Sequence, residues 1–152
     1  MAQTALITGA SNGIGLELAK IHAKQGGDLV LVARSVDKLN ALADELHKYG
    51  VKVAVIAKDL AQPNAGTEIF SETERLGITV DILINNAGIG GHGCFFERDL
   101  TKDMQMIQLN ITSLTELTHL YLQGMIERRS GKILNVFYCI VSTRSFTSSV
   151  LR

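Results

Sequence analysis

The chain has 152 residues, of which 46% are hydrophobic and 20% charged, and it contains a single proline. This length predicts one domain, and the composition excludes disordered, collagen-like and disulfide-scaffold proteins. Fifteen lysines and arginines balance fifteen aspartates and glutamates, so we expect neither nucleic acid nor an anionic membrane as a partner.

Short runs of β-branched residues alternate with longer segments of helical periodicity. The predicted strands are residues 4–8, 29–33, 51–57, 81–84 and 132–136. The predicted helices are residues 13–25, a segment that Ser35 caps and Gly50 ends, a segment between Pro63 and Gly77, and residues 102–129. This alternation predicts an α/β fold whose doubly wound parallel sheet has the strand order 3-2-1-4-5.

The last predicted helix, residues 102–129, carries apolar side chains on more than one face, among them Met104, Ile111 and Tyr121. A helix of this kind should be buried on two sides, against the sheet and against another element. We find no internal repeat and no linker in the sequence, so we predict no boundary between two domains.

A glycine-rich turn at residues 8–15 joins the first strand directly to the first helix. The free N–H groups and the dipole of a helix N-terminus favour a phosphate group at such a place. Gly9 permits a tight turn, Gly13 lets a pyrophosphate approach the backbone, and Gly15 lets the helix pack closely. A merely tight turn is the alternative, but the position between strand and helix favours dinucleotide binding.

The turn resembles the T-G-x-x-x-G-x-G fingerprint of the short-chain dehydrogenases/reductases. Further motifs follow in that family's order and spacing: Asp59-Leu60, then Asn85-Asn86-Ala87-Gly88, then Asn110 in the long helix. The resemblance covers residues 3–136. It implies a Rossmann-type NAD(P)-binding domain over residues 1–136, with a divergent tail over residues 137–152 that is not a separate domain.

The resemblance implies a nicotinamide dinucleotide cofactor and assigns the residues around it. The pyrophosphate and the nearby ribose would be surrounded by Gly9, Ser11, Asn12, Gly13, Ile14 and Gly15. Asp59 and Leu60 would border the adenine, and Asn86, Ala87 and Gly88 would flank the rest of the cofactor. A helix cap is the alternative role of Asp59, and a turn residue that ties neighbouring strands together is that of Asn86.

The end of the second strand distinguishes NADP from NAD. NAD-preferring sites usually carry a carboxylate there, which binds the ribose 2′-hydroxyl. This strand instead ends at Arg34, and the first acidic residue after it is Asp37. A guanidinium pairs well with a 2′-phosphate, so we predict NADP rather than NAD, with a solvated arginine as the alternative.

The catalytic residues of the family are only partly present. In the family a Tyr acts as general acid and base, a Lys four residues later lowers its pKa, a Ser binds the substrate oxygen and an Asn holds a relay water. Asn110 matches the Asn, but Phe137 and Tyr138 stand where the Ser pair is expected, and no Tyr-x-x-x-Lys occurs. We therefore predict a carbonyl or alcohol oxidoreductase-type chain that is truncated on its C-terminal side and catalytically impaired.

Other interpretations stay open. The chain could be a non-enzymatic NADP-binding or partner-pairing module, the product of a disrupted reductase gene, or a reductase that uses Tyr138 or Ser142. An active chain would take a small carbonyl or alcohol substrate, and His92, Cys94 or Phe95 could contact it. We also predict self-association or pairing through the apolar helix 102–129, because its second face lacks a neighbour.

The cysteine content and the N-terminal sequence indicate the cellular compartment in which we expect the protein. Two cysteines, Cys94 and Cys139, are too few for a disulfide framework and indicate a reducing compartment. The sequence shows no signal-peptide pattern and no apolar stretch of membrane-spanning length. Since His92 and Cys94 lie in no larger cluster of ligands, we expect no metal site. The expectation is a cytoplasmic protein.

Overall fold

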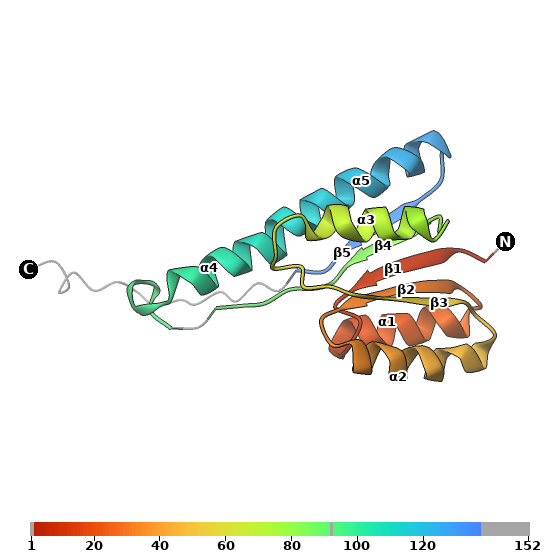
Figure 1. Ribbon diagram of the computed structural model, residues 1–152, viewed down its shortest axis with the longest axis horizontal. Helices are drawn as coiled ribbons and strands as arrows, with labels where there is room; N and C mark the ends of the chain where they lie inside the picture. Colours follow the sequence, from red (N-terminus) through yellow and green to blue (C-terminus); the bar gives the residue numbers. More distant parts are fainter. Residues whose placement is uncertain (1, 92, 138–152) are drawn as a thin grey trace, which may run out of the picture.

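The computed structural model describes residues 2–91 and 93–137 (Figure 1). Its centre is one parallel sheet of five strands in the order β3-β2-β1-β4-β5. The strands are β1 (Thr4–Thr8), β2 (Asp28–Ala33), β3 (Val53–Ala57), β4 (Ile82–Asn85) and β5 (Lys132–Asn135). The predicted fold class and strand order are both confirmed.

The helices cover both faces of this sheet. They are α1 (Gly13–Lys24), α2 (Val36–Leu46), α3 (Ala65–Arg75), α4 (Leu100–Ile107) and α5 (Leu114–Glu127), with 3₁₀ turns η1 (His47–Tyr49) and η2 (Phe95–Glu97). In Figure 1, α1 and α2 lie on one side of the sheet and α3 and α5 on the other, while α4 projects beyond it. Within the described ranges, no helix is long and apolar enough to cross a membrane.

Alternate side chains of the strands pack in two separate hydrophobic cores. In β2, Leu29 and Leu31 pack with the α1 and α2 residues, whereas Val30 and Val32 pack with α3 and α5. All four side chains are at most 2% exposed. A strand buried on both faces is typical of a parallel sheet between two helical layers, which is why these strands read as continuous apolar runs in the sequence.

The helix that we predict to be capped by Ser35 is α2. Ser35 is its N-cap residue, as predicted, but the side chain makes no capping hydrogen bond. The serine carbonyl instead accepts the first helical bond from the Leu39 N–H at 3.1 Å, and Asp37 supplies a negative charge in the first turn. Gly50 does end the segment, in the left-handed conformation after η1.

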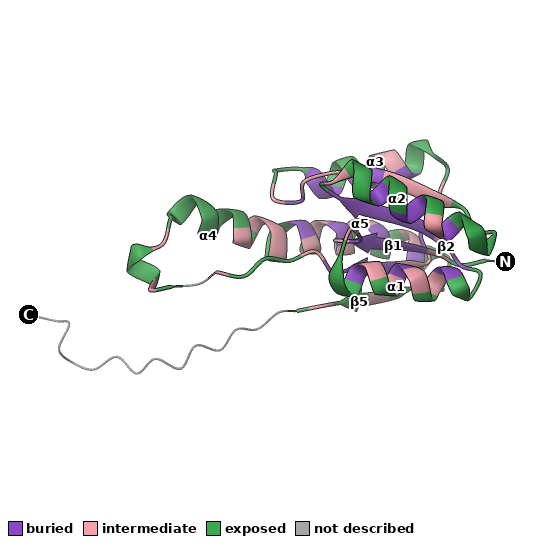
Figure 2. Cartoon of the chain, turned by 90° about the horizontal axis from the view of Figure 1, so that it is seen from below, coloured by how far each residue is buried: buried purple, intermediate pink, exposed green. Residues whose placement is uncertain are grey.

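The predicted long helix begins at Leu100 and contains a π-helical segment, η3 (Gln108–Ser113), between α4 and α5. Its inward face is buried through Leu117, Tyr121 and Met125. A second apolar face is not buried by the described residues, since Ile111 is 58% and Ile126 60% exposed, which agrees with the expectation that this face lacks a neighbour within the chain. Figure 2 shows α4 as largely exposed.

Contacts between α3 and α5 fix the position of α3. The hydroxyl groups of Thr73 and Tyr121 lie 2.8 Å apart, and the ring of Phe70 meets that of Tyr121 edge to face at 5.2 Å. Burial raises the pKa of Tyr121 to about 12, so the phenol stays neutral near pH 7. This hydroxyl is a structural donor and acceptor, and it holds α3 against the long helix.

Candidate functional site

The carboxyl ends of the parallel strands meet at one edge of the sheet. After β3 the chain crosses to the opposite side of β1, where it forms β4. The strand order therefore reverses between β1 and β4, and open α/β sheets bind ligands in the crevice at such a point. The residues that follow β1, β2, β3 and β4 include all of the predicted cofactor-binding positions.

Three glycines in the turn after β1 have different surroundings. A Cβ at Gly9, whose φ is +68°, would lie 3.0 Å from the Ala87 Cα, and one at Gly15 would lie 2.5 Å from the Gly9 carbonyl oxygen. These two glycines allow the turn to pack against the residues that follow β4. Gly13 has a φ of +54°, and a Cβ there would meet nothing within 4 Å, so its open side is accessible to a ligand.

The N-terminus of α1 has no side-chain cap among the described residues. The N-cap residue Asn12 makes no side-chain capping bond, and the first turn contains no acidic residue. The first helical bond runs from the Leu16 N–H to the Asn12 carbonyl at 3.3 Å, and Asn12, Gly13 and Ile14 are exposed. The positive end of this helix dipole therefore faces solvent, next to the open side of Gly13.

Asn86 connects the ends of β1 and β4. Its backbone N–H donates to the Thr8 hydroxyl at 2.9 Å, and its side-chain Nδ2 donates to the Thr8 carbonyl at 2.9 Å. The Ala87 N–H also donates to the Thr8 hydroxyl, at 3.0 Å. Asn86 is thus a turn residue that ties two neighbouring strands together. Its Oδ1, like that of Asn85, is buried and has no partner among the described residues.

Asp59 and Leu60 lie in the loop between β3 and α3. The Asp59 carboxylate accepts a hydrogen bond from the Ala61 N–H at 3.0 Å, and its carbonyl accepts one from the Gln62 N–H at 3.1 Å. The carboxylate therefore shapes the loop rather than capping α3, whose N-cap residue is Asn64. The side chain of Leu60 is buried in the core between the sheet, α3 and α5.

Arg34 follows β2 and is exposed. Ala33 pairs with Ala57 across the sheet, and the Lys58 N–H donates to the Ala33 carbonyl at 2.9 Å. Arg34 therefore lies beside the start of the loop that carries Asp59. In the described part of the chain its guanidinium makes no ion pair, whereas Lys58 pairs with Glu68 of α3.

Asn110 lies in the π-helical segment η3 and binds the loop after β4. Its Nδ2 donates to the Ile89 carbonyl at 2.8 Å, and its Oδ1 accepts from the Ile89 N–H at 3.1 Å. The structure thus brings Asn110 to the residue that directly follows Gly88. The sequence did not predict this pairing, since a helical periodicity does not show which loop backbone a polar side chain meets.

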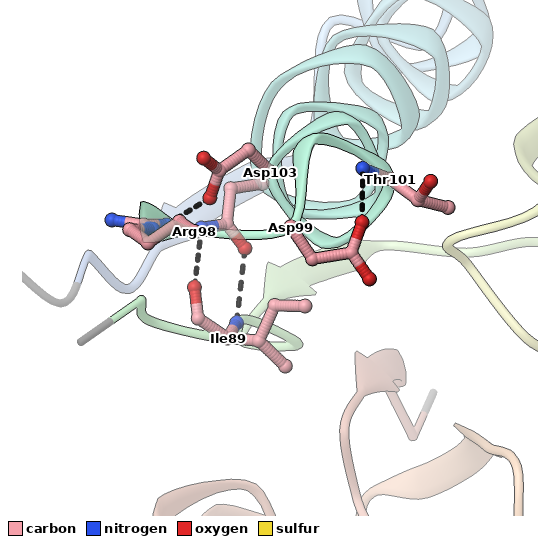
Figure 3. A network of polar contacts seen from close by, with 6 residues as sticks. Ile89, Arg98, Asp99, Thr101 and Asp103 are labelled. Atoms are coloured by element: carbon pink, nitrogen blue, oxygen red, sulfur yellow. Dashed lines mark hydrogen bonds and ion pairs between the residues drawn. The ribbon is translucent and has the colours of Figure 1, made fainter. Parts of the chain in front are cut away.

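A cavity of about 690 Å³ lies beyond this contact, between the loop after β4 and α4. Its lining includes Ile89, Cys94, Arg98 and Asp103. Figure 3 shows that Arg98 pairs with Asp103 at the start of α4, where the Asp99 carboxylate caps the helix by accepting from the Thr101 N–H at 2.9 Å. The cavity is therefore bordered by an internally paired guanidinium.

Some predicted side chains cannot be placed in this geometry. His92, Tyr138 and Ser142 lie outside the described residues. Phe95 is 78% exposed in η2. Across residues 2–91 and 93–137, no three His, Cys, Asp or Glu side chains come together as a metal site would require.

Comparisons with known proteins identify the family to which this fold belongs. The family model for short chain dehydrogenases matches residues 3–147, and so continues past residue 136. The chain is 37% identical over 140 residues to the very-long-chain 3-oxoacyl-CoA reductase of Anas platyrhynchos, covering 87% of this chain and 44% of that protein. It is 32% identical over 149 residues to the 3-oxoacyl-[acyl-carrier-protein] reductase FabG of Aquifex aeolicus, covering 97% and 58%.

Solved structures give the same result. A short-chain dehydrogenase from Sphingobium yanoikuyae in complex with NADPH has a TM-score of 0.82 at 38% identity, covering 88% of this chain and 52% of that one. The L-sorbose reductase of Gluconobacter frateurii, complexed with NADPH and L-sorbose, has a TM-score of 0.83 at 36% identity, covering 88% and 51%. The chain spans about half the length of the relatives that it matches.

Proposed function

The chain belongs to the short-chain dehydrogenase family, and from this premise we propose that it binds NADP(H) and supplies the cofactor-binding part of a carbonyl or alcohol oxidoreductase. The bound cofactor would exchange a hydride with the substrate carbon. The observation that carries the proposal is the exposed N-terminus of α1, which lacks both a side-chain cap and a first-turn carboxylate.

The residues of this edge fit a dinucleotide. Anionic phosphates suit the free N–H groups and the positive dipole end of α1, and Gly13 leaves room for them. Ser11, Asn12, Ile14 and Gly15 would complete that cradle. The Oδ1 of Asn86, which is buried and has no partner within residues 2–91 and 93–137, is an acceptor that a bound hydroxyl group would satisfy. The cofactor would then run from the Asp59–Leu60 loop, past α1, to Ala87 and Gly88.

The preference for NADP over NAD rests on Arg34. Its guanidinium is exposed and unpaired in the described part of the chain, beside the loop proposed to border the adenine. A guanidinium binds a 2′-phosphate through two parallel hydrogen bonds. The NADPH complexes among the similar solved structures support the same cofactor.

Asn110 is the proposed catalytic residue in these 152 residues. Ile89 takes one N–H of its Nδ2 and one lone pair of its Oδ1, so one lone pair of the Oδ1 is left to accept from a water molecule. Since no Tyr-x-x-x-Lys occurs in the sequence, we propose that a polypeptide of these residues binds cofactor and turns over little or no substrate by itself. A binding module that pairs with another chain is the second candidate.

Titration with NADPH and NADH, followed by nucleotide fluorescence, tests the proposal. We expect saturable binding of NADPH. Arg34→Ala should weaken the affinity for NADPH about tenfold or more and leave the affinity for NADH within about twofold. Lys24→Ala is the matched control, because it removes an exposed cation from the opposite end of α1. A chain that shows no saturation up to about 1 mM NADPH would contradict the proposal.

Turnover tests the loss of catalysis that both candidates share. Each predicts little or no oxidation of NADPH with a panel of carbonyl compounds in this chain. Turnover that survives both Tyr138→Phe and Ser142→Ala would exclude these two side chains as an alternative acid–base system, and would contradict the proposed loss of catalysis.

A further inference from the structure

The long helix holds the loop between β3 and α3 by a buried hydrogen bond. The Ser113 hydroxyl donates to the Leu60 carbonyl at 2.7 Å, and the Gln108 Nε2 donates in turn to the Ser113 oxygen at 3.3 Å. Ser113 is 1% exposed and Leu60 5%. The serine hydroxyl is therefore fixed in orientation, because its proton goes to Leu60 and its oxygen accepts from Gln108.

A second contact fixes the other end of the same loop. Glu116, in the first turn of α5, accepts a hydrogen bond from the Gly66 N–H at 3.1 Å and another from the Thr67 hydroxyl. A Cβ at Gly66 would lie 2.6 Å from the Glu116 carboxylate oxygen, so the glycine allows this close approach. The start of α3 and the Leu60 carbonyl are thus both held from the long helix.

The segment that provides Ser113 also provides Asn110. Asn110 holds the backbone of Ile89 after β4, and Ser113 holds that of Leu60 after β3. Both side chains belong to the π-helical segment η3, and π-helical turns within helices are frequent at functional sites. One stretch of six residues therefore contacts the loops on two sides of the crevice.

We propose that Ser113 is a positioning residue for the adenine end of the cofactor site, and that it acts through the Leu60 carbonyl. The inference rests on the proposed function. Without the hydroxyl, the Leu60 carbonyl is buried with no donor, and the loop must move to find one. Since Asp59 and Leu60 are adjacent, this movement displaces the border of the adenine, while the turn after β1 keeps its own contacts with Thr8 and Asn86.

Three ligands separate the adenine end from the phosphate site: NADPH, adenosine 2′,5′-bisphosphate, and inorganic pyrophosphate as a competitor of NADPH. For Ser113→Ala we expect the affinities for NADPH and for adenosine 2′,5′-bisphosphate to be about fivefold to tenfold weaker than in the wild-type chain. The affinity for pyrophosphate should stay within about twofold. Thr112→Ala is the matched control, because it removes an exposed hydroxyl from the same π-helical segment. It should leave all three affinities within about twofold.

Amide hydrogen exchange without any ligand gives an independent measurement of the loop. Ser113→Ala should speed the exchange of peptides over residues 58–64 and leave β1 and β2 unchanged, at a temperature where circular dichroism shows that the variant is folded. Three results would each overturn the positioning role: exchange in the loop that Ser113→Ala leaves unchanged, a pyrophosphate affinity that weakens as much as that of NADPH, and effects of Thr112→Ala as large as those of Ser113→Ala. A wild-type chain that binds no NADPH would instead overturn the proposed function, while the exchange measurement still decides what Ser113 does to the loop.

Discussion

The first turns of α1 and α3 follow β1 and β3 at the same edge of the sheet, and each leaves backbone N–H groups without a helical partner. In α3 the Gly66 N–H and the Thr67 hydroxyl donate to the Glu116 carboxylate, and the first-turn Glu68 pairs with Lys58. In α1 the first turn has no side-chain cap and no carboxylate. The described residues neutralise the positive end of α3 and leave that of α1 without a carboxylate or side-chain cap.

This difference indicates which helix end takes a ligand. An anion gains little at the start of α3, because the Glu116 carboxylate already occupies the place where it would bind. At the start of α1 the described residues supply no side-chain cap, and the same dipole lies beside the exposed, open side of Gly13. The contrast depends on side chains from distant parts of the sequence, since Glu116 lies 50 residues from Gly66.

The largest expected effect comes from adding a methyl group where the α1 turn packs most closely. In Gly15→Ala the new Cβ would lie 2.5 Å from the Gly9 carbonyl oxygen, so backbone must move, and we expect the free energy of unfolding to fall by about 3 kcal/mol. Gly13→Ala is the control, because its Cβ meets nothing within 4 Å and only the left-handed backbone costs about 1 kcal/mol. Urea denaturation measures both, and equal losses would contradict the packing argument.

A smaller effect should come from placing a carboxylate at the free helix end. Asn12→Asp keeps the size of the side chain and adds a charge at the N-cap of α1, so NADPH affinity should fall about tenfold or more. The free energy of unfolding should stay unchanged or rise by about 0.5 kcal/mol, since an acid suits this end of the dipole. Fluorescence titration and urea denaturation check these opposite signs.

The same substitution at α3 provides the control for Asn12→Asp. Asn64 is the N-cap of α3 and likewise makes no side-chain capping bond, but Glu116 already serves that helix. Asn64→Asp should therefore leave NADPH affinity within about twofold. Weakening as large as that of Asn12→Asp would mean that the two helix ends do not differ in ligand binding.

The smallest expected effect concerns the carboxylate that serves α3. Glu116→Gln removes the charge while an amide oxygen can still accept from the Gly66 N–H, so we expect the free energy of unfolding to fall by about 1 kcal/mol. Glu127→Gln, at the exposed C-terminal end of α5, is the control and should change it by less than about 0.5 kcal/mol. If Glu116→Gln left the free energy of unfolding unchanged, the carboxylate charge would not stabilise α3.

Most of the fold could be predicted because local patterns and the sheet agree. The runs that form β1 and β2 are apolar on both faces, and the glycines at 50 and 77 end helical segments with positive φ angles. Ser35 is the N-cap residue of α2 as predicted, but backbone bonding and Asp37 serve that helix without a bond from its side chain. The π-helical segment was missed as well, because an interruption of the helix leaves the apolar periodicity almost unchanged.

The sequence by itself determined the strand order, the glycine turn and the positions of Arg34, Asp59 and Asn86 at one edge, because β-α alternation allows few topologies. Only the tertiary structure decided which polar groups satisfy one another. It placed Glu116 on the first turn of α3, Ser113 on Leu60 and Asn110 on Ile89. Such pairs depend on how the long helix packs over the sheet, and hydrogen bonding between distant segments leaves no period in the sequence.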